Sequence, residues 1–319
     1  MGEFDLIDRY FKRPALRSPL GVGDDCALLA PKPGMQLAVS TDMLVEGRHF
    51  LSTVDPFKLG HKALAVNLSD LAACGAAPLA FTVALALPEA NEAWLAPFAR
   101  GLLALADEFE CELVGGDTTR GPLNICITVF GEVPAGGALL RSGARTGDDI
   151  YVSGTLGDAR LALEVFRGGL SVPAAAFELA RARMEQPTPR VALGQALRGI
   201  ATAAIDVSDG LLGDLGHVLQ QSRVGACIEI DAAFGLLATS NVAGLQAERQ
   251  FEFVLAGGDD YELAFTAAPT QRGAVEAAAK ESGTAVTRIG RIEAEPGLRL
   301  FDAGGQRVTR TYGSFDHFA

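Results

Sequence analysis

The sequence predicts a mixed α/β protein built from two domains. Its 319 residues correspond to roughly two domains at about 150 residues each. Hydrophobic residues make up 49% of the chain, which is enough to fill two cores. Strand-like and helix-like segments alternate along both halves, as they do in α/β folds.

The first domain is expected over residues 1–135. Asp55 and Pro56 form an N-cap and first-turn pair, and Asn91 is typical of a second helix N-cap. A Gly-Gly-Asp step at 115–117 is expected to end a strand. In chain order we expect a helix at 4–12, strands at 26–30 and 36–40, a helix at 56–73, a strand at 79–87, a helix at 92–109, and strands at 112–114 and 123–133.

The second domain is expected over residues 148–319. Between 134 and 149 the composition changes to Gly, Arg and Ala without periodicity, which indicates a domain boundary. In chain order we expect a strand at 150–153, a helix at 156–166, two helices in a proline-marked stretch, a strand at 203–207, a helix at 210–221, strands at 226–230 and 253–256, a helix at 268–282, and strands at 286–292 and 298–301.

The negative net charge argues against nucleic acids and anionic membranes as binding partners. Lys and Arg number 27 against 39 Asp and Glu, a formal charge of −12 that repels nucleic acid and anionic lipid. Residues 71–88 carry no charge, but Gly75, Pro78 and Pro88 interrupt them, which favours domain core over a membrane span. We therefore expect neither a nucleic-acid nor a membrane partner.

The cysteines indicate a reducing compartment. Five cysteines are dispersed without a C-x-x-C pair, so neither a disulfide framework nor a zinc knuckle is indicated. The first residues lack a basic segment followed by an apolar one, which an export signal would have. The expected location is the cytoplasm.

Familiar catalytic motifs are missing. The sequence contains no G-x-x-x-x-G-K-[S/T] phosphate loop, no kinase-type H-R-D loop, no H-E-x-x-H zinc motif and no G-x-S-x-G elbow. These absences argue against P-loop nucleotide hydrolases, protein kinases, zinc hydrolases and α/β-hydrolases.

Aspartates at glycine-rich positions or expected strand ends are the outstanding feature. Each single cluster is most often a turn or a helix cap. Several together, beside hydroxyl groups, suit Mg²⁺, which takes oxygen ligands and bridges to phosphates. The aspartate motifs of the first half of the chain resemble those of the second half. This similarity is either coincidental or means that both halves present acidic strand ends toward one cleft. The clusters lie at 24–25, 40–42, 67–70, 116–117, 206–209 and 258–260.

One arginine lies close to the expected boundary. The Arg141 guanidinium could reach a phosphate bound between the domains. The alternative is a solvated linker arginine.

The ordered motifs closely resemble those of the thiamine-monophosphate kinases, a family in the aminoimidazole ribonucleotide synthetase superfamily. The resemblance extends from about residue 3 to the C-terminus and is weakest at 166–200 and 232–252. The motifs that carry it are at 23–27, 40–42, 49–50, 62–73, 115–121, 141–144, 205–211, 257–263 and 315–318.

The resemblance implies roles for individual residues. The implied magnesium ligands are Asp25, Ser40, Thr41, Asp42, Asp70, Asp117, Asp206 and Asp209, among which Asp42, Asp70, Asp117 and Asp209 are the catalytic candidates. The implied ATP contacts are Gly116, Asp117, Arg141 and Ser208, and the implied substrate contacts are His49, Asp259 and Phe315.

Two of these positions depart from the family pattern. Asp259 stands where the family often has Glu, and its carboxylate is one methylene shorter. Phe315 stands where other members have Tyr or Trp, so it keeps an aromatic face but loses a polar tip.

The implied activity is ATP-dependent phosphorylation of thiamine monophosphate to thiamine diphosphate, the last step of thiamine diphosphate biosynthesis. It would proceed by direct in-line transfer assisted by several Mg²⁺ ions, in a homodimer joined through the first-domain sheet. Two alternatives are another ATP-using enzyme of the superfamily and a non-catalytic nucleotide or metal sensor. A selenophosphate synthetase would have a reactive Cys near its N-terminus, whereas here Cys26 follows the Asp pair.

Overall fold

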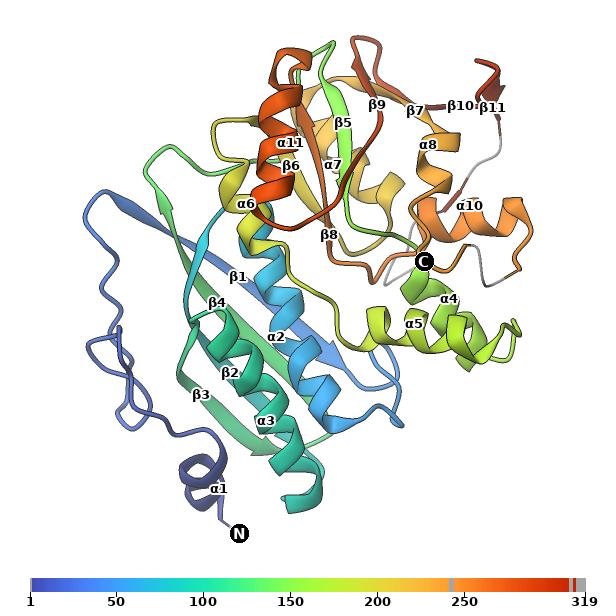
Figure 1. The fold of residues 1–319 in the computed structure, drawn as a ribbon. Helices are drawn as coiled ribbons and strands as arrows, with labels where there is room; N and C mark the ends of the chain where they lie inside the picture. Colours follow the sequence, from blue (N-terminus) through green and yellow to red (C-terminus); the bar gives the residue numbers. More distant parts are fainter. Residues whose placement is uncertain (1, 241–243, 310–311, 314–319) are drawn as a thin grey trace. The chain divides into compact units, whose positions relative to one another are not determined.

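The computed structural model describes residues 2–240, 244–309 and 312–313 (Figure 1). Its contacts divide the chain into two compact units. The first unit comprises Met1–Leu71 and Ala76–Gly136, and the second comprises Ala72–Gly75 and Gly137–Ala319.

The first unit contains a four-stranded sheet of order β1-β4-β2-β3, in which only the β2–β3 pair is parallel. Helices α2 and α3 lie on one face of this sheet (Figure 1). They pack closely because Gly60 and Gly101 carry no side chain: a Cβ on either would meet backbone oxygen of the other helix at 2.1 and 1.8 Å. The elements are α1 (Glu3–Tyr10), β1 (Met35–Val45), α2 (Pro56–Ala73), β2 (Ala77–Leu87), α3 (Glu92–Glu108), β3 (Glu112–Arg120) and β4 (Asn124–Pro134).

The two faces of this sheet differ in burial. On β4, Ile127 and Val129 are fully buried, and they pair with Asp42 and Ser40 on β1. Because paired residues point to the same side, Ser40 and Asp42 face the helices. The alternate β1 residues Val39 and Met43 are 57% and 53% exposed. The other face of the sheet is therefore open along β1, while Ala27 and Leu29 pack on it near the buried Ala80.

The second unit contains a seven-stranded sheet of order β11-β10-β7-β9-β5-β8-β6. Every position of β5 and β8 is buried, so both faces of these central strands are covered. The elements are β5 (Asp149–Ser153), α4 (Asp158–Phe166), α5 (Ala174–Glu185), α6 (Val191–Ala196), β6 (Ala201–Val207), α7 (Leu211–Ser222), β7 (Gly225–Glu229), α8 (Ile230–Phe234), α10 (Ala247–Ala256), β8 (Glu262–Ala267), η1 (Pro269–Gln271), α11 (Arg272–Glu281), β9 (Val286–Glu293), β10 (Gly297–Phe301) and β11 (Arg307–Val308).

The mixed α/β class predicted from the sequence is confirmed, with three local corrections. Residues 26–30 form no strand, because only an isolated Leu20–Leu28 bridge occurs there. Strand β3 continues through the Gly-Gly-Asp step to Arg120, since both glycines pair with β2. Residues 253–256 end helix α10, because a short apolar run fits a buried helix as well as a strand.

No helix within the described residues is long and apolar enough to cross a membrane. The uncharged stretch 71–88 instead forms the end of α2 and strand β2.

Candidate functional site

Three candidate residues of the first unit meet where α2 packs on β1. The Ser40 hydroxyl donates to the Asp70 carboxylate at 2.5 Å. One helical turn before Asp70, the Asn67 side chain accepts a hydrogen bond from the Asp42 backbone N–H at 3.1 Å. Asp42 and Asp70 are both half-buried. Strand periodicity on β1 and helical periodicity on α2 thus direct oxygen-bearing side chains toward one another.

Thr41 and Asp117 point to the other face of the sheet. Thr41 pairs with Thr128 on β4, and their hydroxyls are 2.9 Å apart. Asp117 pairs with Ala84, which pairs with Cys126, so it shares this open face. Strands β1 and β3 form opposite edges of the sheet. Within this unit, Thr41 and Asp117 therefore do not join the Ser40–Asp70 pair.

The other first-unit candidates lie in loops. Asp25 is exposed, and its backbone N–H donates to the Asp24 carboxylate at 2.8 Å. The His49 Nδ1 accepts from the Val45 backbone N–H at 3.0 Å, which ties the ring to the end of β1. That nitrogen must be unprotonated to accept.

In the second unit, the end of β6 and the loop after it carry three candidates. Asp206 is 6% exposed on β6, and Ser208 and Asp209 follow it. The Asp214 carboxylate accepts hydrogen bonds from the backbone N–H groups of Ser208, Asp209 and Gly210 at 3.0–3.1 Å. Burial raises the pKa of Asp214 to about 6, against these hydrogen bonds and with help from the Asp209 charge.

The turn containing Asp259 is bonded to this loop. The backbone N–H of Asp259 donates to the Ser208 carbonyl at 2.7 Å, and that of Tyr261 donates to the Val207 carbonyl at 2.8 Å. The structure therefore brings a candidate substrate contact, Asp259, beside a candidate ATP contact, Ser208.

Arg141 and Phe315 complete the candidates. Arg141 is exposed, and its carbonyl accepts from the Ser222 hydroxyl at 3.2 Å. Phe315 lies outside the described residues.

The donor chemistry of the first-unit cluster suits magnesium. Ser40, Asp42 and Asp70 offer hydroxyl and carboxylate oxygens, the ligands that this hard cation prefers. Within the part of the chain that the structure describes, no group of three or more His, Cys, Asp or Glu side chains is placed to hold a metal. The Ser40–Asp70 pair is thus the best-defined pair of oxygen donors among the first-unit candidates.

Asp214, the buried acid that supports the second-unit loop, was not among the predicted site residues. It was detectable, because an acid in the first turn of a helix is a common capping signal. Asp260 belongs to the predicted 258–260 cluster, but its structural role was not predictable: its carboxyl accepts from the Gly157 backbone N–H at 2.9 and 3.1 Å, a partner distant in sequence.

Comparison with known proteins identifies the class first. Residues 23–133 match the family model described as AIR synthase related protein, N-terminal domain, and residues 145–303 match the corresponding C-terminal domain. The chain therefore has the two-domain architecture of the AIR synthase related proteins.

Relatives define the family within that class. A thiamine-monophosphate kinase of Salmonella typhimurium is 46% identical over 100% of this chain and 98% of its own length. The crystal structure of the thiamine-monophosphate kinase from Stenotrophomonas maltophilia is 45% identical, with a TM-score of 0.84 and 96% of each chain covered. AaThiL complexed with AMPPCP and TMP is 29% identical, with a TM-score of 0.74 over 91% of this chain and 89% of that one. The chain belongs to the thiamine-monophosphate kinase family.

Proposed function

We propose that the protein transfers the terminal phosphoryl group of ATP to thiamine monophosphate, giving thiamine diphosphate and ADP in the last step of thiamine diphosphate biosynthesis. The observation that carries this proposal is 46% identity to a thiamine-monophosphate kinase over the full chain. The related AaThiL structure, which holds AMPPCP and TMP together, supports a site that takes a nucleotide and a phosphorylated acceptor.

The reaction needs positioning and charge neutralisation more than a base. A phosphate oxygen of thiamine monophosphate attacks the γ-phosphorus as the bond to the β–γ bridging oxygen breaks, with the two oxygens in line. The attacking oxygen is already ionised near neutral pH, so no strong general base is required. The chief difficulty is to hold two polyanions together.

The carboxylates are proposed to hold magnesium. Asp42, Asp70 and Ser40 in the first unit and Asp206 and Asp209 in the second supply oxygen donors, with Asp25, Thr41 and Asp117 as further ligands. Bound Mg²⁺ would neutralise phosphate charge and orient the reacting groups.

The remaining candidates are proposed to bind the two substrates. Gly116, Ser208 and Arg141 would contact ATP, and the guanidinium would supply a fixed positive charge. Asp259, His49 and Phe315 would contact thiamine monophosphate, because a carboxylate and an aromatic face complement its cationic thiazolium.

We also propose a cytoplasmic homodimer. The exposed β1 side chains Val39 and Met43 support pairing through the open face of the first-unit sheet. The five cysteines, all free, support a reducing compartment.

Coupled ADP release tests the function. With ATP and Mg²⁺, we expect turnover on thiamine monophosphate and none on thiamine or on aminoimidazole ribonucleotide precursors. Chelation of Mg²⁺ should abolish it. Turnover only on another acceptor would favour a different enzyme of the superfamily, and ATP binding without turnover on any acceptor would favour a sensor.

A further inference from the structure

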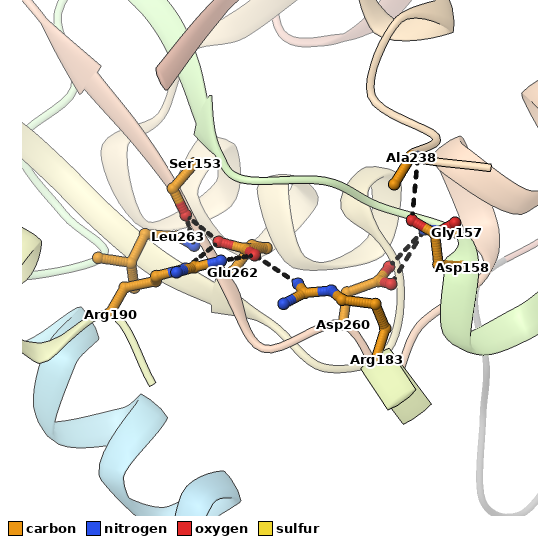
Figure 2. A network of polar contacts seen from close by, with 9 residues as sticks. All are labelled: Ser153, Gly157, Asp158, Arg183, Arg190, Ala238, Asp260, Glu262 and Leu263. Carbon is orange, nitrogen blue, oxygen red and sulfur yellow. Dashed lines mark hydrogen bonds and ion pairs between the residues drawn. The ribbon is translucent and has the colours of Figure 1, made fainter. Parts of the chain in front are cut away.

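A buried charge cluster lies where β8 begins, directly after the Asp259 turn. The Glu262 side chain is 0% exposed and accepts from Arg183 at 2.5 Å and from Arg190 at 2.5 and 2.6 Å (Figure 2). The Ser153 hydroxyl on β5 also donates to Glu262, at 2.5 Å. We call Glu262, Arg183, Arg190 and Ser153 the Glu262 cluster.

The turn before this cluster has an unusual backbone. Gly258, Asp259 and Tyr261 all have positive φ values, of 71°, 63° and 54°. Residues other than glycine rarely adopt this left-handed backbone conformation, and such strain persists only where the surrounding structure enforces it. A Cβ on Gly258 would lie 2.8 Å from the Ser208 carbonyl oxygen, so the turn also needs glycine to approach the neighbouring loop.

Arg183 links the cluster to the turn itself. Figure 2 shows the Arg183 side chain reaching Glu262, and the charge of Arg183 also acts on Asp260. Burial raises the pKa of Asp260, and the Gly157 hydrogen bond and the positive charge of Arg183 oppose that rise. The Arg183 guanidinium thus bonds to Glu262, directly after the turn, and its charge favours the ionised form of Asp260 inside the turn.

We propose that Glu262, Arg183 and Arg190 are positioning residues for substrate binding. They fix the end of the strained turn, which holds the Asp259 carboxylate at one distance from the Ser208 loop. The inference rests on the proposed function, in which Asp259 contacts thiamine monophosphate. It assigns a role to α5 and the segment before α6, where the sequence resemblance is weakest.

A second cluster of the same composition provides a matched control. Asp149 is 2% exposed and accepts from Arg272 at 2.7 and 3.0 Å and from Arg288 at 2.6 Å. It pairs with Ala267, at the opposite end of β8 from Glu262. Both clusters place two arginines on one buried carboxylate of the same sheet, but only the Glu262 cluster adjoins the strained turn.

The test compares Glu262→Gln with Asp149→Asn in the full-length protein. For Glu262→Gln we expect the KM for thiamine monophosphate to rise about tenfold or more, with the KM for ATP changed less than about threefold. For Asp149→Asn both KM values should stay within about twofold of wild type although Tm falls, because that cluster only stabilises the sheet. Equal KM values in the two variants at similar Tm loss would overturn the proposal.

A conservative variant covers the case in which Glu262→Gln does not fold. Arg190→Lys keeps the charge but loses the two-pronged guanidinium contact, so it should also raise the KM for thiamine monophosphate selectively. An unchanged KM in folded Arg190→Lys would contradict the inference. A wild-type protein inactive on thiamine monophosphate would refute the proposed function, whereas an active wild type with unaltered variants would refute only the positioning role.

Discussion

The acidic site candidates of the first unit and three buried acids of the second unit have different surroundings. In the first unit Asp42 and Asp70 lie where α2 packs on β1 and are half-buried among oxygen donors. In the second unit both faces of the central strands are covered, and buried Asp158, Asp214 and Asp260 each accept backbone hydrogen bonds. A carboxylate within reach of solvent can exchange water for a metal ion, whereas a fully buried one must be satisfied by the protein.

Because of this difference, substitutions of the two groups of acids should have different effects. Replacing Asp42 or Asp70 should affect catalysis more than folding. Replacing a buried acid of the second unit should affect folding first, because it leaves backbone N–H groups without an acceptor.

Asp70→Asn should lower kcat/KM about 100-fold or more, because one proposed metal ligand loses its charge. Tm should change little, since an amide can still accept the Ser40 hydrogen bond. ADP release and thermal unfolding measure the two effects. Asp231→Asn, an exposed acid on α8, is the control and should behave as wild type. Wild-type activity in Asp70→Asn would remove Asp70 from the metal site.

The double variant Val39→Lys, Met43→Lys should convert a dimer to a monomer, because four charges would face each other across a buried interface. Size-exclusion chromatography with light scattering should give half the wild-type mass. Leu179→Lys, at a residue 56% exposed on α5, should leave the mass unchanged. A wild-type monomer would show that the open face of the first sheet is not covered by a second copy.

Stability should depend on pH with opposite sign at Asp214 and Glu112. The pKa of Asp214 is raised to about 6 from 3.8, so its contribution to stability is greatest below pH 3.8 and is lost as pH rises toward 6. This loss should amount to about 2–3 kcal/mol. Burial also raises the pKa of Glu112, but hydrogen bonds from Arg17, Leu16 and Ser18 outweigh it and lower the pKa overall. Its contribution is therefore present above its usual value of 4.5 and lost as pH falls.

Urea unfolding at a series of pH values measures both contributions against Asp214→Asn and Glu112→Gln. The difference between wild type and Asp214→Asn should fall between pH 4 and 6 and then stay constant. The same sign of pH dependence in both variants would contradict the opposite pKa shifts of Asp214 and Glu112.

Asn91→Ala should have the smallest effect. The Asn91 side chain accepts from the Ala93 backbone N–H at 2.9 Å and caps α3. Its loss should lower the free energy of unfolding by about 1 kcal/mol without changing activity. Asn91→Asp preserves the acceptor and should retain stability; an equal loss in both variants would mean that the cap contributes nothing.

Local signals predicted much of the fold. The Asp55–Pro56 pair and Asn91 mark helix starts within a few residues, so α2 and α3 were predictable. The strand expected at 253–256 was wrong because four apolar residues carry no period that separates a strand from a buried helix. The strand end expected at 115–117 was wrong because pairing with β2 keeps the two glycines in the sheet.

The site was less predictable from local pattern. The aspartates were identified through ordered motifs, but the Ser40–Asp70 contact joins a strand to a helix 30 residues later. Glu262 and its arginines are separated by 72 and 79 residues, and no sequence period reports such pairs. Asp149 and Glu262 each accept from two arginines, and only the fold shows that Glu262 lies next to the strained turn whereas Asp149 does not.

The central claim is direct phosphoryl transfer from ATP to thiamine monophosphate, and a single-turnover experiment with γ-labelled ATP and Mg²⁺ tests it most directly. The account predicts that label appears in thiamine diphosphate at the rate of ADP formation while the protein stays unlabelled. A labelled protein that forms from ATP alone and passes its label to thiamine monophosphate at a competent rate would contradict direct transfer. Label found only in inorganic phosphate would contradict the proposed activity itself.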